Sequence, residues 1–470
     1  MAPTLTPATT GDLAMIDAMG PGRDYYRTRQ RLTVNDVAGA PLAQLSLVPP
    51  LYVGRALEAL RRTRPLPQDE RIAAMARAAD VFEQATVAGL DPVRYREIVS
   101  RVSGVPVTVV DNAVNSIAEV LRGIAENGFE ARPQGAVGHW RDPRTRAAES
   151  GRAVWTRRGE VLAVHAAGNH PGPHGLWPEA LALGYRVAVR PSQREPFTGH
   201  RLITALRSSG FDSDQVIFLP TDHAGAGQIL ERADLGMVYG GDEVVRKYAW
   251  DTRVLPQGPG RAKILITAEQ DWREHLDTIV TSVAGEAGVA CINATALLVE
   301  GDPRPLAGAI AERLAHLPSL PPQHPSAALP VQPLAQARAL EQYLQRAARD
   351  AEPVLGGEGI VHELGDGSAV LRPAVHLVGN SRDPRLGIEL PFPCVWVAPW
   401  SRADPLVPLQ HSLVLTAITT DEDLIGDLVD DPTIANVHVG DHPTHWMRPG
   451  VPHDSYLGEF LMRTKTVIRE

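Results

Sequence analysis

Residues 161–175 read VLAVHAAGNHPGPHG, and residues 186–190 read RVAVR. Each begins as a short apolar run with the length of a buried strand, and the first passes directly into a loop rich in glycine and proline. Further strands and helices of the same alternation are expected at 200–208, 216–219, 225–232, 236–239 and 243–249. This spacing predicts right-handed βαβ units and a parallel sheet.

A second series of alternating strands and helices is expected to begin near residue 264. Its expected strands and helices lie at 264–267, 272–285, 294–299, 305–314, 334–347, 369–378, 395–398 and 422–429. Residues 53–127 have the apolar spacing of helices, and residues 1–35 are expected to form a loosely packed lead-in. Glycine and proline interrupt residues 130–160, which predicts an extended arm or hairpin. Two α/β domains divided near residue 264 are therefore expected.

The composition bounds the class of protein. The chain has 470 residues, of which 44% are hydrophobic and 21% charged, with a net charge of −9. That charge argues against a nucleic-acid partner, and no apolar run approaches the roughly 18 residues of a membrane span. Two cysteines exclude a disulfide scaffold, and the start MAPTLTPA lacks the features of a signal peptide. We expect a soluble cytoplasmic protein.

Cys291 and Asn169 are the first candidates for chemistry. Cys291 lies among small residues in GEAGVACINATALLVEG, on a loop before a strand. Its thiolate could attack a carbonyl, but such a cysteine could equally be a small buried hydrophobe. Asn169 follows a buried strand, so its amide could stabilise an oxyanion or serve the loop conformation. Cys394, in LPFPCVWV, is expected to be buried and inert.

Histidines do not predict a metal site. His170 and His174 have the i, i+4 spacing of a helical metal pair, but Pro171 and Pro173 lie between them and prevent a regular helix. No carboxylate or cysteine nearby completes a ligand set. The histidines of GDHPTHW are equally weak candidates.

The ends of the predicted strands favour an anion site. Arg190 ends a strand, and Ser192 and Arg194 follow it in RPSQREP. These side chains could bind a phosphate, or they could belong to a strand end that is simply exposed to solvent. Glycines that allow close approach of the backbone to a phosphate follow at later strand ends: Gly225, Gly227, Gly240 and Gly241. The G-x-G-x-x-G fingerprint of an ordinary dinucleotide fold is absent from the sequence.

Together these segments resemble the aldehyde dehydrogenase superfamily, from about residue 50 to the C-terminus. VLAVHAAGN is similar to the family's strand ending in Pro-Trp-Asn, which implies that Asn169 is the oxyanion-hole amide. GVACINA resembles the Gly-Gln-x-Cys loop, which implies that Cys291 is the nucleophile.

The resemblance continues in the cofactor-binding segments. RVAVRPSQREPFTG is similar to the strand ending in Lys-Pro that reaches the adenosine ribose, with Arg190 at the lysine position. DLGMVYGGDEVV is similar to the Phe-Thr-Gly-Ser segment, which implies that Gly240 and Gly241 lie near the pyrophosphate. GIELPFPCVWVAPW resembles the Glu-x-Phe-Gly-Pro segment, which implies that Glu389 binds the nicotinamide ribose, with Phe392 nearby.

The family architecture implies a division of the chain. Residues 1–264 would hold the N-terminal helices and a Rossmann-like cofactor domain, with an oligomerisation arm at about 130–160. Residues 265–445 would form the catalytic domain that carries the nucleophile. The tail, 446–470, would return to the cofactor domain and the arm, and the family implies a homodimer or homotetramer.

Two departures from the family pattern bear on function. Hydrolytic members carry a general-base glutamate where this chain reads LPQGPGRAKILI at 255–266, so Gln257 or Gly258 takes its place. Without a base, water would attack a thioester slowly, and the chain looks most like the acyl-CoA reductase branch. Glu286 could substitute for the base or cap a helix.

Gln193 stands where NAD-preferring relatives often carry an acid, which favours NADP(H) over NAD(H).

The resulting hypothesis is NADPH-dependent reduction of an acyl thioester to an aldehyde through a covalent thioester on Cys291. The acyl carrier would be coenzyme A or an acyl carrier protein. The alternatives are NAD(P)-dependent oxidation of an aldehyde to a carboxylic acid, with Glu286 or an ordered water replacing the base, and a non-catalytic subunit of the same fold.

Overall fold

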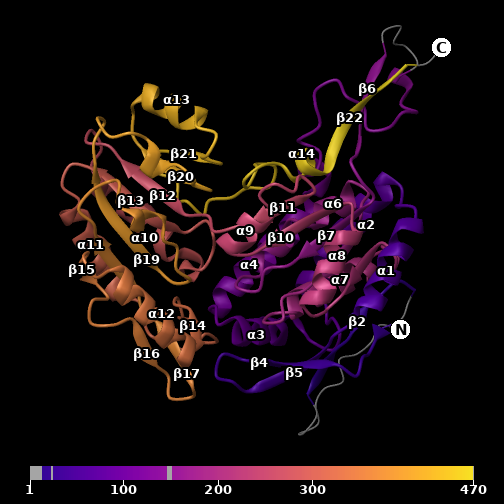
Figure 1. Cartoon of the computed structure of the whole chain (residues 1–470), viewed down its shortest axis with the longest axis horizontal. Helices are drawn as coiled ribbons and strands as arrows, with labels where there is room; N and C mark the ends of the chain where they lie inside the picture. The colour runs from indigo at the N-terminus through magenta and orange to yellow at the C-terminus, as the bar shows by residue number, and fades with distance from the viewer. Residues whose placement is uncertain (1–12, 23–24, 146–150, 469–470) are drawn as a thin grey trace.

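The computed structural model describes residues 13–22, 25–145 and 151–468. The molecule has two halves, each built on a seven-stranded sheet (Figure 1). The first sheet has the order β11 (Val254–Gln257), β10 (Leu235–Tyr239), β7 (Val161–His165), β8 (Arg186–Arg190), β9 (Val216–Phe218), β2 (Ala18–Met19), β3 (Tyr25–Tyr26). Its strands from β11 to β9 are parallel, as the alternation of strand and helix predicted.

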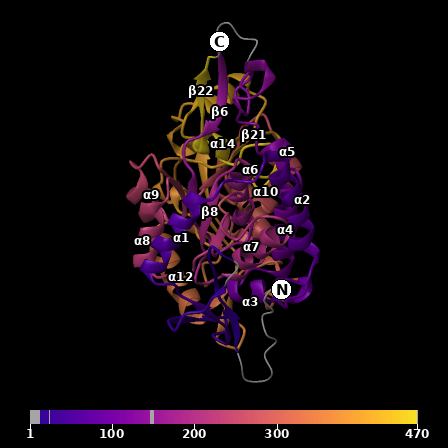
Figure 2. The same cartoon turned by 90° about the vertical axis from the view of Figure 1, so that its right-hand side faces the viewer.

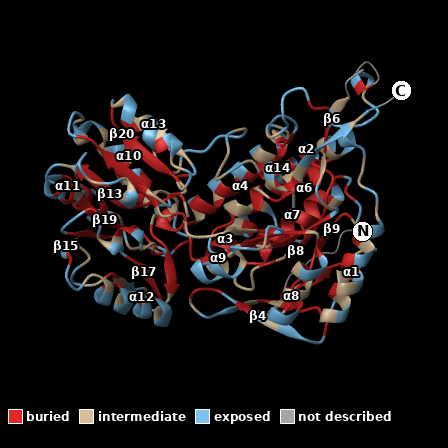
Figure 3. Ribbon diagram, turned by 45° about the horizontal axis from the view of Figure 1, so that its top comes forward, coloured by how far each residue is buried: buried red, intermediate tan, exposed pale blue. Residues whose placement is uncertain are grey.

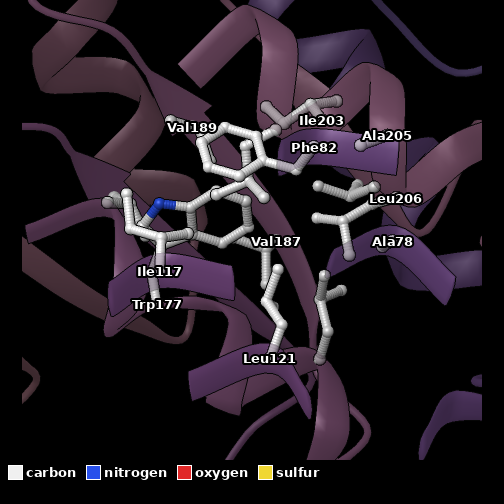
Figure 4. Packing of buried hydrophobic residues seen from close by; sticks show 14 of the residues in the cluster. Ala78, Phe82, Ile117, Leu121, Trp177, Val187, Val189, Ile203, Ala205 and Leu206 are labelled. Carbon is white, nitrogen blue, oxygen red and sulfur yellow. The ribbon is translucent and has the colours of Figure 1, made fainter. Parts of the chain in front are cut away.

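Side chains alternate between the two faces of this sheet. Val187 and Val189 of β8 pack against Phe82, Leu121 and Trp177 on one face (Figure 4). That face is covered by α2 (Gln68–Gln84), α4 (Val107–Arg122), α6 (Pro178–Ala182) and α7 (Phe197–Ser208), and the opposite face by α1 (Pro50–Arg62) and α8 (His223–Arg232). The period-two pattern of the strands thus buries both faces.

The N-terminal segment departs from the expected lead-in. β1 (Ala14–Ile16) joins β5 (Pro41–Ser46) and β4 (Arg31–Asn35) in a small sheet, and β2 adds antiparallel to β9. Ile16 and Met19 are fully buried, so the prediction of loose packing was wrong. Strands of two or three residues are too short to show a period in the sequence, and tertiary contacts stabilise them.

The second sheet has the order β15 (Glu352–Leu355), β18 (Ala374–Leu377), β19 (Cys394–Trp400), β13 (Ala294–Glu300), β12 (Ala262–Ile266), β20 (Leu415–Ile418), β21 (Val437–Val439). In the described part of the chain, β15 pairs antiparallel with β18, and the other neighbouring strands of this sheet are parallel. Its helices are α10 (Leu276–Ala284), α11 (Arg304–Ala315), α12 (Leu334–Ala347) and α13 (Glu422–Asp430). The middle strands of both sheets are buried throughout (Figure 3). The chain passes from the first sheet to the second between Gln257 and Ala262.

A two-stranded ribbon projects from the half that holds the first sheet (Figures 1 and 2). β6 (Arg152–Arg157) pairs antiparallel with β22 (Met462–Val467), so the region expected as an arm supplies one strand and the C-terminal tail supplies the other. Residues 146–150 of the expected arm lie outside the described residues. The remaining α-helices and strands of the described residues are α3 (Pro92–Ser103), α5 (Ile124–Asn127), α9 (Asp242–Tyr248), α14 (Leu457–Leu461), β14 (Val331–Pro333), β16 (Val361–Glu363) and β17 (Ser368–Leu371). No helix in the described ranges is long and apolar enough to cross a membrane.

Candidate active site

A cavity of about 1190 Å³ lies between the two halves. On one side it is lined by the residues that follow the C-terminal ends of β7, β8 and β10, and on the other by the loop before β13. In an open α/β sheet, ligands bind beyond the C-terminal ends of the strands. The predicted site residues that line it are Asn169, Ser192, Arg194, Gly240, Gly241, Cys291 and Glu389. The structure therefore brings together most of the residues that the sequence singled out.

A left-handed turn presents Cys291 to this cavity. Glu286, Ala287 and Gly288 have φ values of 50°, 57° and 65°, directly after α10. A Cβ on Gly288 would lie 2.3 Å from the backbone nitrogen of Pro393, so only glycine fits there. Backbone strain of this kind persists only where the surrounding structure enforces it. The turn leaves the Cys291 side chain half-buried, with access to the cavity.

The side chain of Asn293 forms hydrogen bonds with the backbone of the loop that carries Cys291. Its Nδ2 donates to the carbonyl oxygens of Ser282 (3.1 Å) and Gly285 (2.7 Å), and its Oδ1 accepts from the N–H of Ala290 (3.0 Å). On the other side, the backbone of Gly260 lies so close that a Cβ there would be 1.9 Å from the carbonyl oxygen of Cys291. The nucleophile candidate is therefore held from several directions.

Asn169 lies against the Cys291 loop. Its Nδ2 donates to the carbonyl oxygen of Val289 at 3.2 Å, and the side chain lines the cavity. A side-chain amide carries two N–H donors, so one remains for a ligand. The arrangement suits a donor beside a reacting carbonyl oxygen.

Glu286 does not cap a helix. Its Oε2 lies 3.0 Å from Nε2 of His170, and Nδ1 of His170 accepts from the N–H of Gly172 at 3.0 Å. Because Nδ1 is an acceptor, the neutral ring carries its proton on Nε2 and donates it to the carboxylate. Glu286 is thus tied to the loop after β7 at the edge of the cavity.

Gln257 stands where the family glutamate is expected, and it lines the cavity. Its Nε2 donates to Oδ2 of Asp454 at 3.0 Å. His453, beside Asp454, also lines the cavity, and Asp454 and the Cys291 sulfur raise the pKa of His453 against the effect of burial. His453 and Asp454 were not predicted from the sequence, because they lie in the C-terminal segment and no periodicity or motif marks the His-Asp pair.

Glu389 occupies the cofactor side of the cavity. Its Oε2 accepts from the N–H of Arg261 at 2.7 Å, and the Arg261 guanidinium pairs with Asp242. Burial raises the pKa of Glu389 to about 6, although the bonds from Arg261 and Gly260 oppose this shift. A carboxylate that still has free lone pairs can accept hydrogen bonds from a sugar hydroxyl.

The aldehyde dehydrogenase family model matches residues 50–404. The chain belongs to the aldehyde dehydrogenase family. The acyl-CoA reductase branch is not specifically indicated by this match.

Curated relatives match over part of the chain. An aldehyde-dehydrogenase-like protein of Sinorhizobium fredii, y4uC, is 23% identical over 282 residues, which is 56% of this chain and 52% of that protein. Malonate-semialdehyde dehydrogenase 3 of Geobacillus kaustophilus is 24% identical over 137 residues, 28% of either chain. The matches thus span about half the length of these relatives or less.

Solved structures show the same fold over nearly the whole length. The aldehyde dehydrogenase KauB of Pseudomonas aeruginosa has a TM-score of 0.81 at 16% identity, and 96% of each chain is covered. An aldehyde dehydrogenase of Bacillus cereus, solved with NAD+, has a TM-score of 0.80 at 15% identity, with complete coverage of both chains. At these identities the likeness establishes the fold.

The aldehyde dehydrogenase fold implies a nicotinamide cofactor, and the residues here fit one. Gly240 and Gly241 line the cavity, and Glu389 offers a buried carboxylate. Arg190, at the end of β8, has a buried Nε with no hydrogen-bond partner among the described residues. Burial lowers the pKa of its guanidinium, and the nearby Asp222 only partly opposes this shift.

Two residues expected to contact the cofactor lie away from the cavity, and a third, Arg194, lines the cavity but has its guanidinium bonded to protein groups. Phe392 is 1% exposed and packs in the core under β19 rather than in the cavity, because its apolar segment enters a buried strand. Gly227 was expected on a loop after a strand, but α8 begins at His223, so Gly227 lies inside this helix and does not line the cavity. The guanidinium of Arg194 is already engaged, donating to the carbonyl oxygen of Ser103 (2.5 Å) and to Gln332 (3.2 Å).

The histidines considered for metal binding have other partners. Nδ1 of His174 accepts from Nε1 of Trp177 at 3.2 Å, and burial lowers the pKa of His174 to about 4. His170 pairs with Glu286. Within the described ranges, no three His, Cys, Asp or Glu side chains are grouped so that they could hold a metal ion.

Proposed function

We propose that this protein oxidises an aldehyde to a carboxylic acid with a nicotinamide cofactor and Cys291 as the covalent nucleophile. The observation that carries the proposal is the left-handed turn that presents Cys291 to the cavity opposite Asn169. A cysteine kept only for packing would not require such a turn. Relatives named malonate-semialdehyde dehydrogenase support an aldehyde as the substrate class.

Four groups of this chain would hold the cofactor. Gly240 and Gly241 suit the close approach of a pyrophosphate, Glu389 suits the hydroxyls of a ribose, and Arg190 suits the adenosine end. When bound, the nicotinamide supplies the acceptor for a hydride from the substrate. Gln193 lacks the charge that would repel a 2′-phosphate, which supports NADP(H) over NAD(H).

The residues of the chain supply the nucleophile and the oxyanion donors. The sulfur of Cys291 forms a bond to the carbonyl carbon of the aldehyde, and the carbonyl oxygen takes the negative charge. The amide of Asn169 and the N–H of Cys291 stabilise that oxygen. Overall, the aldehyde loses one hydride, which carries the two electrons of the oxidation to the cofactor. Water supplies the second oxygen of the acid and releases a proton, and the Cys291 thiol is regenerated.

Reduction of an acyl thioester is a second candidate. The observation in its favour is that Gln257 and Gly258 occupy the place of the family's general-base glutamate. Transfer of the acyl group to or from a thiol such as coenzyme A does not require a base that activates water. In that case the carrier would be coenzyme A or an acyl carrier protein.

Assembly through the ribbon of β6 and β22 is also proposed. Residues Arg463–Thr466 of β22 are exposed, and the ribbon projects from the body (Figure 1). A projecting ribbon has edges that can pair with another copy of the chain, which suits a homodimer or homotetramer.

An absorbance assay of the reduced nicotinamide separates the two reactions. Purified protein is given NAD+ or NADP+ with short, long-chain and aromatic aldehydes, and the products are analysed for free acid. Formation of reduced cofactor and an equal amount of acid, without added thiol, is the expected result. Loss of NADPH with acyl-CoA, with aldehyde and free thiol appearing and no oxidation of aldehydes, would instead establish the reductase.

A further inference from the structure

We infer that His453 takes the proton of the Cys291 thiol and holds it as an imidazolium beside the thiolate, and that Asp454 and Gln257 position this imidazole. The inference rests on the proposed function only in that Cys291 is the nucleophile. It assigns a catalytic residue, His453, that the sequence did not single out, at a site that lacks the general-base glutamate of the family motif.

The fold brings His453 to Cys291 by a crossing of the chain. The segment between β21 and α14 passes from one half of the molecule to the other (Figure 1), and His453 lies on it. The His453 carbonyl accepts a hydrogen bond from Nδ2 of Asn436, which also donates to the carbonyl of Leu413 at 2.8 Å. The His453 side chain is only 11% exposed. The backbone of His453 is therefore held at the wall of the cavity that Cys291 also lines, and its side chain is largely shielded from solvent.

A carboxylate accompanies this imidazole. Nδ1 of His453 lies 3.9 Å from Oδ1 of Asp454 and has no hydrogen-bond partner among the described residues. Asp454 is held in turn, because its Oδ2 accepts from Nε2 of Gln257 (3.0 Å) and its Oδ1 from the N–H of Ser455 (3.1 Å). Gln257 and Asp454 are positioning residues, since neither touches the reacting sulfur.

Electrostatics favour the proton on the ring. Burial lowers the pKa of His453, but Asp454 and the Cys291 sulfur outweigh it and raise the pKa to about 10. Burial alone would raise the pKa of Asp454, yet His453 and Gln257 hold it below its usual value. A carboxylate and a thiolate on either side of one imidazole thus both stabilise its cationic form.

The other groups near the ring do not compete for this role. Tyr239 is half-buried, and its pKa is raised by burial and by the nearby Asp454 and Cys291, so it stays neutral. Behind the ring lies a small cavity that is lined by His438 and Arg448 as well as His453. Nδ1 of His438 lies 3.3 Å from the carbonyl oxygen of Pro443.

The proton transfer balances within the pair. The S–H bond of Cys291 breaks, its electron pair stays on sulfur, and the proton binds the imidazole of His453, with no net change of charge. The thiolate is the reactive form of cysteine toward a carbonyl carbon. A Cys–His pair is one of the general ways in which a cysteine nucleophile is activated.

Alkylation by iodoacetamide tests this pair without substrate or cofactor. The rate at Cys291 is followed by peptide mass spectrometry across pH in wild type, His453→Gln and the matched control His438→Gln. Cys394 serves as an internal reference, because it is buried and burial raises its pKa to about 12. Circular dichroism verifies that each variant is folded.

In wild type and in His438→Gln we expect the alkylation rate at Cys291 to change little between about pH 6.5 and 8.5, because His453 accepts the thiol proton. In His453→Gln the rate at about pH 6.5 should fall on the order of 10- to 100-fold, because an ordinary thiol is only about 1% ionised there. Asp454→Asn should give an intermediate loss.

A wild-type pH dependence in folded His453→Gln would overturn the inference. If His453→Gln proves unfolded, Asp454→Asn decides by the same criterion, and an unchanged profile there refutes the pair. Iodoacetamide reacts with Cys291 without any aldehyde, so this test is independent of the proposed function. If the expected pH dependence is found but no aldehyde is oxidised, the Cys291–His453 pair stands and the proposed function is wrong.

Discussion

Gln257 donates a hydrogen bond of 3.0 Å to the carboxylate of Asp454 and so joins the end of β11 to the C-terminal segment of the chain. The glutamate expected at position 257 or 258 is absent, but a carboxylate from elsewhere in the fold lies beside it. This carboxylate accompanies His453 at the cavity that contains Cys291. The site thus regains an acid–base group through a tertiary contact rather than through the family motif.

Cys291→Ser should abolish turnover and leave cofactor binding intact. A serine hydroxyl is a far weaker nucleophile than a thiolate, so a loss on the order of a thousandfold or more is expected. Reduced cofactor formation reports turnover, and calorimetric titration reports binding. Cys394→Ala is the matched control, which should keep its activity because Cys394 lies in the core. Substantial residual turnover in Cys291→Ser would refute the covalent mechanism.

Gly288→Ala should displace the nucleophile loop. The position has φ of 65°, and a Cβ would lie 2.3 Å from the nitrogen of Pro393, so we expect a loss of about 1–3 kcal/mol in the free energy of unfolding together with lower activity. Gly308→Ala is the control: it lies in α11 with open space around a Cβ, and alanine should stabilise it slightly. Urea denaturation measures both, and equal effects would contradict the strained turn.

Arg190→Ala should discriminate between the two nicotinamide cofactors. Its buried Nε has no protein partner, and the loss of a charged contact to a 2′-phosphate should weaken NADP+ by about tenfold or more and NAD+ much less. Arg194→Ala should affect both cofactors alike and destabilise the fold, because Arg194 holds Ser103 and Gln332. Dissociation constants from calorimetry test this, and equal losses for Arg190→Ala would remove the 2′-phosphate assignment.

Glu389→Gln should change the pH dependence of stability. Because burial raises the pKa of Glu389 to about 6, the folded state binds its proton more tightly than the unfolded state does. The stability from this group is present below the ordinary carboxyl pKa of about 4.3 and is lost as pH rises through about 6. The variant should therefore gain stability relative to wild type between about pH 4 and 7.

Urea denaturation at several pH values measures this difference, with the exposed Glu358→Gln as the control. A difference between Glu389→Gln and wild type that stays constant with pH would contradict the raised pKa. The control should show no trend of this kind.

The alternation of strands and helices was readable from the sequence because buried strands and amphipathic helices carry distinct periods. Val161–His165 and Arg186–Arg190 form β7 and β8 with the expected bounds. The strands near Ile16 and Met19 were not readable, since they are short and gain their stability from the first sheet. The family match extends the same fold to the rest of residues 50–404.

The site was only partly predictable. Cys291 and Asn169 lie on loops at the ends of strands, a place that the strand pattern itself identifies. Phe392 was misplaced because its local sequence suits a core as well as a ligand contact. His453 reaches Cys291 only through the crossing of the C-terminal segment, and no local pattern encodes an approach between residues so distant in the chain.

Trapping the covalent intermediate tests the central claim most directly. Purified protein is mixed with an aldehyde and oxidised cofactor, quenched in acid, digested and analysed by mass spectrometry for an acyl group on cysteine. We predict that the acyl mass appears on the peptide that contains Cys291, only when both aldehyde and oxidised cofactor are present. An acid product formed without any acyl group on Cys291 in quenched samples across the time course, or an acyl group on Cys394 instead, would contradict Cys291 as the nucleophile.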